Sequence, residues 1–319
     1  MLSQTLTILD PTSLLGREIA DGLAAELPDV RCRLFHTSGA DNHLIANVGG
    51  AASVVTPLQS LDELAGSAAL IVSEPLGEEL AAALLDWLVR HPEVALVDAS
   101  QPGIAGEQTL TVLDEAPRRH GQPRWYHLLD PSLAAPVRLL QALRAFRPTR
   151  AHLTVFRSAS GFGYAAVEEL AVQAAARLSG LAPTDHSALP AVVAFDLAPA
   201  GEAAQAALQR QLAGVLPDIE LDLQVVEMGV FFGHAASFFV PLTEPVTERR
   251  VRTALRAGGL RLARRNQSVR PSDLADEESA MCARLRVTDR QISGWLVADG
   301  LRLAGAAAVV RIATDVMAF

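Results

Sequence analysis

Residues 6–19 read Leu-Thr-Ile-Leu-Asp-Pro-Thr-Ser-Leu-Leu-Gly-Arg-Glu-Ile. A short apolar strand, a tight turn and a helix start follow one another, which is the order that opens a dinucleotide-binding unit. In such units, glycines let the turn approach a pyrophosphate and direct backbone N–H groups toward it. Here Asp10, Pro11 and Ser13 stand in the turn instead. A free Asp10 carboxylate about 4 Å from a phosphate would be repelled by roughly 4 kcal/mol per charge pair at an effective dielectric near 20.

The turn nevertheless keeps part of an ordinary phosphate-binding loop. Thr12 and Gly16 remain from that loop, and together with Ser13 we interpret them as vestigial cofactor-binding positions. A second carboxylate, Glu74, follows the third buried strand at 69–72. Asp10 and Glu74 together argue against dinucleotide binding. The sequence therefore predicts that this strand–turn–helix element is retained as part of the fold but no longer binds its ligand.

Strand and helix signals alternate through the first third of the chain, which predicts right-handed crossovers and a mostly parallel sheet. We therefore expect an α/β, Rossmann-like N-terminal domain over residues 1–122. Residues 123–300 show grouped strands with helices between them, which is typical of an α+β domain. Within it, Glu220–Phe232 and Ala236–Val240 are expected to be paired strands. Residues 301–319 are predicted to form a C-terminal helix that packs back on the first domain.

Composition limits the classes of function. The net charge of −9 makes nucleic acid an improbable partner, because phosphate binding needs a basic face. All 27 basic residues are arginine, so no lysine is present for Schiff-base or ammonium chemistry. Cys32 and Cys282 lie far apart in the sequence and without metal-ligand spacing, which favours a reducing, cytoplasmic setting. The N-terminus lacks signal-peptide features and no apolar run would span a membrane. Arg249–Arg250 and Arg264–Arg265 are interpreted as solvated faces.

Four islands in the second half of the chain carry a resemblance. They are Thr154–Leu170, which contains a Ser-Gly-Phe-Gly turn, then Ala194–Pro199, Val230–His234 and Ala298–Arg302. In identity, order and spacing they resemble aspartate-semialdehyde dehydrogenases, over essentially the whole chain. The resemblance implies a second domain of that family's catalytic and dimerisation type. It also implies a mechanism in which a cysteine attacks the aldehyde, a histidine acts as acid and base, and NADP accepts hydride.

Most functional residues that the resemblance implies are replaced. Ala134 stands at the expected nucleophile position, and Glu227 stands where the family has a substrate-binding arginine. Ile104 occupies the position of a second arginine, and Arg157 that of a glutamine, whereas His234 retains the catalytic histidine. A segment rich in glutamine replaces a Lys/Glu pair, at Gln205, Gln209 and Gln211.

Several retained residues have two interpretations. His234 is either the old acid and base or a packing histidine at a strand end. Ser160, Gly161 and Gly163 either line a nicotinamide, as the resemblance implies, or form a strand-to-helix turn that requires glycine dihedrals. Ser132 is the alternative nucleophile, although it lies two residues out of register and needs an activating base.

The resulting hypothesis is a degenerate, Usg-like paralogue of aspartate-semialdehyde dehydrogenase that has lost NADP binding and catalysis and has an interaction or regulatory role. We expect a homodimer, with a mixed dimer with an active relative as a further assembly, and neither a metal nor a cofactor. The first alternative is an active NADP-dependent oxidoreductase of amino-acid biosynthesis, in which the cofactor site still functions. The second is a sensor that binds another small ligand in the old cleft.

Overall fold

The computed structural model describes residues 5–40, 42–104, 109–113, 117, 124–183, 187–275 and 277–317. The chain divides into two compact units, Met1–Leu129 with Ala304–Phe319, and Asp130–Leu303. The first unit extends beyond the expected boundary at residue 122, because β8 (Trp125–Leu128) pairs with β6 (Ala95–Asp98) and so belongs to the first sheet. In the described part of the chain, no helix has the length and apolar character needed to cross a membrane.

The first unit contains an eight-stranded sheet in the order β3-β4-β2-β1-β5-β6-β8-β7. Its strands run parallel except for β3, which pairs antiparallel with β4, so the predicted mostly parallel sheet is confirmed. The remaining bounds are β1 (Thr5–Leu9), β2 (Arg31–His36), β3 (Leu44–Val48), β4 (Ala51–Pro57), β5 (Ala69–Val72) and β7 (Leu110–Val112).

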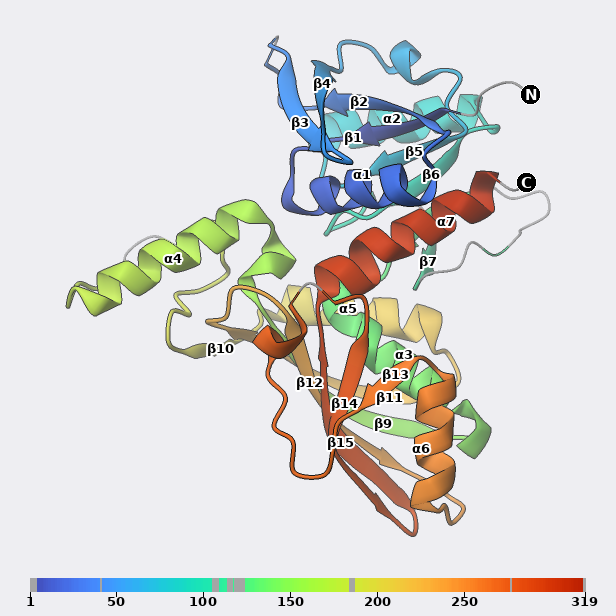
Figure 1. The fold of residues 1–319 in the computed structure, drawn as a ribbon, viewed down its shortest axis with the longest axis vertical. Coiled ribbons are helices and arrows are strands. Elements are labelled where there is room, and N and C mark those ends of the chain that lie inside the picture. Colours follow the sequence, from blue (N-terminus) through green and yellow to red (C-terminus); the bar gives the residue numbers. More distant parts are fainter. Residues whose placement is uncertain are drawn as a thin grey trace. The chain divides into compact units, whose positions relative to one another are not determined.

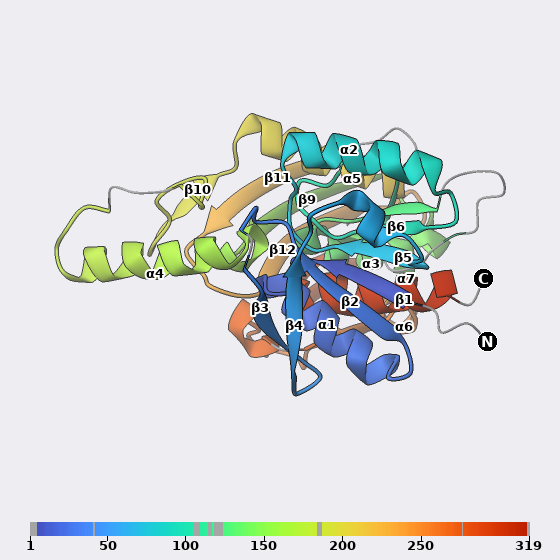
Figure 2. The same cartoon turned by 90° about the horizontal axis from the view of Figure 1, so that it is seen from above.

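Helices cover both faces of this sheet (Figure 2). On one face lie α1 (Leu14–Glu26) and α7 (Ala307–Met317), which contact each other, and α7 also contacts β5 and β6. On the other face lies α2 (Glu78–Arg90), whose Trp87 packs against strand residues of the core. Two shorter helical elements are the 3-10 turn η1 (Leu61–Leu64) and the π-helical turn Leu301–Ala306, which precedes α7.

The second unit contains a seven-stranded sheet in the order β10-β11-β9-β12-β15-β14-β13. The expected direct pairing of β11 (Glu220–Met228) with β12 (His234–Pro241) is wrong, because β9 (Arg150–Arg157) lies between them. Backbone bonds also join the segments that follow these strands: the carbonyls of Val230 and Phe231, between β11 and β12, accept the amides of Ala159 and Ser160 in the turn after β9. The other strands are β10 (Leu197–Pro199), β13 (Leu260–Leu262), β14 (Ala280–Thr288) and β15 (Gln291–Ala298).

Four helices accompany the second sheet (Figure 1). The helix α3 (Ala134–Ala142) packs on β12 and β15 and contacts α6 (Glu248–Ala257), which covers β13 and β14. The helix α5 (Glu202–Val215) packs on β11. By contrast, α4 (Tyr164–Leu178) extends away from the sheet in both views (Figures 1 and 2). Short 3-10 turns are η2 (Pro131–Leu133), η3 (Arg144–Phe146), η4 (Ala159–Phe162) and η5 (Pro271–Leu274).

Candidate functional site

The turn after β1 uses most of its hydrogen-bonding groups internally. The Ser13 hydroxyl accepts the amide of Gly16 at 2.9 Å and thereby caps α1, while the Ser13 amide donates to the Asp10 carbonyl at 3.1 Å. The Asp10 amide donates to the Phe35 carbonyl at 2.7 Å, and Pro11 has no N–H to offer. A Cβ at residue 16 would overlap the Asp10 carbonyl, so glycine is required there for the turn itself. The amides of Asp10, Ser13 and Gly16 are therefore already engaged within the protein.

Asp10 in this turn and Glu74, which follows β5, have different surroundings. Asp10 accepts the amide of Thr37 at 2.8 Å and its hydroxyl at 2.7 Å, so the free carboxylate expected from the sequence is instead held beyond the end of β2. Glu74 is half-buried and hydrogen-bonds to Ser13, the capping residue of α1. Burial raises the pKa of Glu74, the charge of Asp10 raises it further, and the Ser13 hydrogen bond opposes both. A carboxylate of the chain itself therefore stands near the N-terminus of α1, where the helix dipole favours negative charge.

In the second unit, a buried ionic network lies across two neighbouring strands. Arg157 on β9 and Glu227 on β11 are register partners, with Nε–Oε2 and Nη2–Oε1 distances of 3.1 and 2.7 Å. The third guanidinium nitrogen, Nη1, lies 3.5 Å from Oδ2 of Asp130, and the guanidinium carbon lies 4.4 Å from the centre of the Phe162 ring. Burial alone would lower the pKa of Arg157, but the carboxylates of Asp130 and Glu227 hold it above its usual value. Arg157 is thus positively charged, and each of its three guanidinium nitrogens faces a carboxylate oxygen.

The ion pair relates two positions, 157 and 227, at which this chain departs from the pattern that the resemblance implies. The resemblance places a substrate-binding arginine at position 227 and a glutamine at position 157, so each change by itself suggests a loss. Together they move the guanidinium to the adjacent strand and present its forked edge to Glu227, the bidentate geometry that arginine uses for carboxylates. Sequence reasoning missed this relationship, although the signal was a pair of opposite charges at the ends of two apolar strands.

His234 begins β12 and is enclosed. Its Nδ1 accepts the Ser158 amide at 3.2 Å, which places the proton of the neutral ring on Nε2. A Cβ on Gly161 would come within 3.1 Å of the ring, and one on Gly300 would come closer still. The ring therefore packs against two glycine backbones and is 3 % exposed.

The charge state of His234 follows from its surroundings. Burial lowers its pKa to about 4, and the neighbouring guanidinium of Arg157 also lowers it, while Asp130 and Asp299 act in the opposite direction. The imidazole is consequently neutral at pH 7 and has little affinity for a proton. A general base works best when its pKa lies near the operating pH.

The expected nucleophile position carries no nucleophile. Ala134 is fully buried at the start of α3. Ser132, two residues earlier, lines the same small crevice as His234. Its hydroxyl donates to Oδ1 of Asp130 at 2.5 Å, and its amide donates to the same oxygen at 2.9 Å. The nearest hydroxyl in sequence is thus bound to a carboxylate that also faces Arg157.

The other residues examined by sequence lie elsewhere. Ile104 is in the core of the first unit, and its amide donates to the buried carboxylate of Asp98 at 2.5 Å. Cys32 lies in β2 and Cys282 in β14, where burial raises the pKa of the Cys282 thiol to about 12. Within the described residues, His, Cys, Asp and Glu side chains do not gather in groups of three that could hold a metal ion.

The turn at Ser160, Gly161 and Gly163 is accounted for by the fold. Gly163 has φ of 90° at the junction of η4 and α4, a conformation that favours glycine. Gly161 passes close to the His234 ring. Ser160 donates its amide to the Phe231 carbonyl at 2.9 Å and shares a hydrogen bond with the hydroxyl of Ser158.

The three glutamines of α5 fasten this helix to its surroundings. Each side chain bonds a backbone group of β11 or of the segment before α3. The bonds are Gln205 with Val225, Gln209 with Leu221, and Gln211 with Asp130.

Residues 139–303, just over half of the chain, match the family model described as semialdehyde dehydrogenase, dimerisation domain. The chain belongs to the semialdehyde dehydrogenase family. Among curated relatives, aspartate-semialdehyde dehydrogenase 2 of Vibrio cholerae is 27% identical over 196 residues, covering 54% of this chain and 58% of the relative. Aspartate-semialdehyde dehydrogenase of Shewanella violacea is 26% identical over 197 residues, covering 56% and 58%. The matched region thus spans less than two thirds of either relative.

Solved structures of semialdehyde dehydrogenases show the same fold. Aspartate semialdehyde dehydrogenase II from Vibrio cholerae, complexed with ASA, superposes with a TM-score of 0.85 at 20% identity and covers 100% of this chain and 99% of its own. A probable aspartate-semialdehyde dehydrogenase from Pseudomonas aeruginosa gives 0.82 at 21% identity, covering 97% of each chain. The enzyme with NADP from Candida albicans gives 0.70 at 11% identity, covering 99% and 98%. These likenesses confirm the predicted two-part fold.

Proposed function

We propose that this chain is a semialdehyde dehydrogenase homologue that has lost NADP binding and catalysis and acts through protein interaction, as a Usg-like paralogue. The observation that carries the proposal is the buried pair of Arg157 and Glu227. Glu227 occupies both donors of the guanidinium fork, so a substrate carboxylate would have to displace a carboxylate of the protein. Removing one partner of a buried pair costs about 3–5 kcal/mol.

The remaining chemistry of the second unit supports the same proposal. Ala134 offers a methyl group where the family mechanism needs a thiolate. His234, with a pKa of about 4, is a poor proton acceptor at neutral pH. The hydroxyl of Ser132 donates to a carboxylate rather than to an imidazole. The arrangement thus offers no nucleophile, and its histidine is a weak base.

The β1 turn in the first unit fits a dinucleotide pyrophosphate poorly. Pro11 lacks an N–H group, and Ser13 consumes the amide of Gly16. Glu74 adds negative charge beside the capping residue of the helix. An incoming pyrophosphate would therefore meet a carboxylate and find the amides of Ser13 and Gly16 already engaged, which supports the loss of the cofactor seen with the Candida albicans enzyme.

The match to a dimerisation domain supports a homodimer. A mixed dimer with an active relative would give the chain a regulatory role without chemistry of its own. The two separated cysteines support a cytoplasmic location.

An NADPH titration combined with a turnover assay on aspartate semialdehyde tests the proposal, with the Vibrio cholerae enzyme as positive control. We expect neither saturable NADPH fluorescence change nor turnover. Saturable binding with turnover would overturn the proposal. Thermal stabilisation by a metabolite but not by NADP would favour the ligand-sensor alternative instead.

A matched variant tests whether Glu227 only blocks a substrate site that is otherwise able to catalyse the reaction. Glu227→Gln keeps the shape of the side chain and removes its charge. If Glu227 merely blocked a competent site, this variant would gain turnover, and such a gain would contradict the proposal. We expect no gain, because Ala134 supplies no nucleophile and His234 is still a weak base.

A further inference from the structure

One edge of the second sheet is only partly covered. The short strand β13 pairs with β14 at three positions, from Leu260↔Ala280 to Leu262↔Cys282, and the last backbone bond runs from Ala263 to Cys282. From residue 283 to 288, no strand of the described chain pairs with this side of β14. The register between β14 and β15 shifts between Ala283 and Arg286, where Arg284 has φ of 53°, so a bulge interrupts the first part of this edge. Beyond the bulge, the outward N–H and C=O groups of β14 form a template for another strand.

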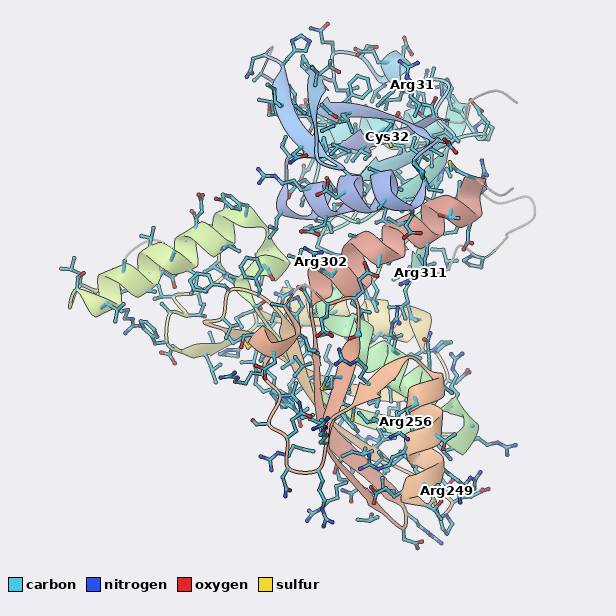
Figure 3. All side chains as sticks on the ribbon, viewed as in Figure 1. Arg31, Cys32, Arg249, Arg256, Arg302 and Arg311 are labelled. Atoms are coloured by element: carbon cyan, nitrogen blue, oxygen red, sulfur yellow. The ribbon has the colours of Figure 1, made fainter. Side chains whose placement is uncertain are left out.

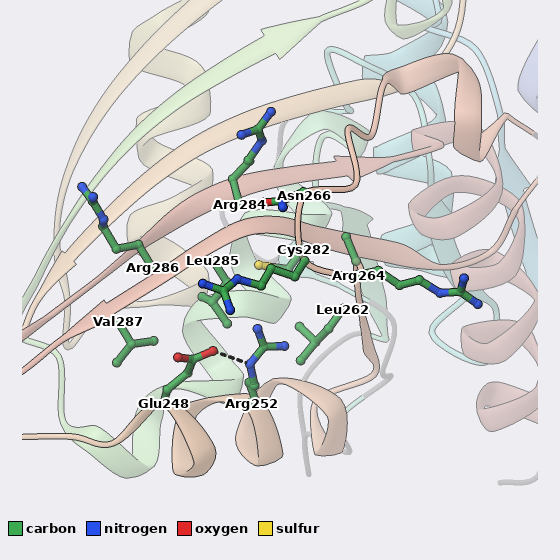
Figure 4. Close-up of a pocket in the computed structure, with 12 residues that line it drawn as sticks. Glu248, Arg252, Leu262, Arg264, Asn266, Cys282, Arg284, Leu285, Arg286 and Val287 are labelled. Carbon is green, nitrogen blue, oxygen red and sulfur yellow. Dashed lines mark hydrogen bonds and ion pairs between the residues drawn. The ribbon is translucent and has the colours of Figure 1, made fainter.

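A groove of about 580 Å³ follows this free edge, between β14, α6 and the segment after β13 (Figure 4). Side chains on β14 alternate along it. Arg284 and Arg286 extend to one side of the strand, while Leu285 and Val287 extend to the other, toward α6 (Figure 4). The edge therefore offers two charged and two apolar side chains in alternation.

The groove is basic although the chain is acidic. Four arginines line it without an ion pair to any described carboxylate: Arg264, Arg265, Arg284 and Arg286. Its one carboxylate, Glu248, is already bound to Arg252 at 2.7 Å. Four arginines without an ion pair to a described carboxylate thus gather beside the free edge, in a chain whose net charge is −9.

This charge pattern selects the kind of strand that can pair. A second copy of the same edge would place arginine opposite arginine, which destabilises a cross-strand pair. A strand with carboxylates at alternate positions would instead face Arg284 and Arg286, and its other side chains would meet Leu285 and Val287. The same arginines thus oppose self-association and favour an acidic partner.

We propose that the free edge of β14 binds an extended segment of a partner protein in which acidic and apolar residues alternate, by strand addition to the sheet. Main-chain hydrogen bonds supply the attachment, and the alternating side chains supply the specificity. This binding site shares no residue with the argument for the loss of catalysis. The NADPH titration therefore tests the proposed function, and the binding test below tests strand addition, each without depending on the other.

The test is fluorescence anisotropy of the full chain with a capped, labelled hexapeptide of alternating Glu and Val at low ionic strength. We expect saturable binding, and about tenfold weaker binding when alternate peptide nitrogens are methylated, because methylation removes the strand hydrogen bonds. Equal affinity of the methylated peptide would overturn strand addition and leave a purely ionic contact. Absence of saturable binding up to millimolar peptide would overturn the site.

Charge reversal supplies a matched comparison. The double variant Arg284→Glu/Arg286→Glu should bind the Glu/Val peptide at least about tenfold more weakly and should gain binding to a Lys/Val peptide. Arg249→Glu/Arg256→Glu makes the same change of net charge on α6 outside the groove (Figure 3) and should retain binding. Equal loss in both double variants would overturn the assignment to this edge. The switch to the Lys/Val peptide excludes misfolding as the cause of the loss.

Discussion

The buried pair of Arg157 and Glu227 makes an asymmetric prediction about stability. Arg157 serves two carboxylates, Glu227 and Asp130, whereas Glu227 is bound to the guanidinium of Arg157 alone. Replacing Arg157 with methionine leaves two carboxylates buried without a counter-charge. Replacing Glu227 with leucine leaves the guanidinium with Asp130. The arginine substitution should therefore cost more.

The magnitudes follow from burial. Glu227 is 2 % and Asp130 5 % exposed, so neither carboxylate can recover much hydration in place. We expect Glu227→Leu to lower the free energy of unfolding by about 3 kcal/mol and Arg157→Met by about 5 kcal/mol. The double variant leaves only Asp130, which keeps its two bonds from Ser132, and should cost about 2 kcal/mol. Adding Glu227→Leu to Arg157→Met should thus restore stability.

Urea unfolding followed by circular dichroism measures this cycle. A control pair lies on the same two strands, where Asp222 and His152 are register partners at 2.9 Å but are about half exposed. Removing that pair should change stability by no more than about 1 kcal/mol. The reasoning is refuted if Glu227→Leu costs as much as Arg157→Met, or if the two costs simply add.

Three further predictions concern single sites. Because the folded pKa of His234 is about 4 and the unfolded value is 6.5, the unfolded chain binds the proton first, so stability should fall by about 3 kcal/mol as pH drops from about 6.5 to about 4. His234→Gln should lose that part of the pH dependence of urea unfolding, and an unchanged slope would contradict the assignment. Arg33→Met removes donors to three carbonyls and two hydroxyls and should cost about 2 kcal/mol in thermal unfolding, with Arg33→Lys restoring less than half. Gly229→Ala should destabilise by about 1–3 kcal/mol, because its Cβ would overlap the Val193 carbonyl, whereas Gly214→Ala, in open space on α5, should stabilise by about 0.5–1 kcal/mol; similar effects at both sites would refute the steric argument.

The sequence predicted the parts of the fold that local patterns determine. Apolar strands that alternate with amphipathic helices identified β1, β5 and β6 and the parallel sheet they form. Three strands of the same sheet were missed: β3, β7 and β8. The strands β3 and β7 are half-exposed, and β7 and β8 lie on either side of the expected domain boundary at residue 122, so their short apolar stretches were not distinguished from loops.

The candidate site was less predictable because it depends on which strands are neighbours. Both Arg157 and Glu227 were singled out as departures from the family pattern, but their contact depends on β9 lying beside β11. The sequence favoured β12 as that neighbour, since the two strands are consecutive, and this choice concealed the ion pair. The enclosure of His234 likewise comes from Gly161 and Gly300, which are distant in sequence.

The ion pair between β9 and β11 also constrains how these two positions can change. Arginine at position 227 alone would set two guanidinium groups against each other inside the sheet. Glutamine at position 157 alone would leave the buried carboxylate of Glu227 without a counter-charge. Each single replacement therefore lowers stability, so we expect the two positions to vary as a pair.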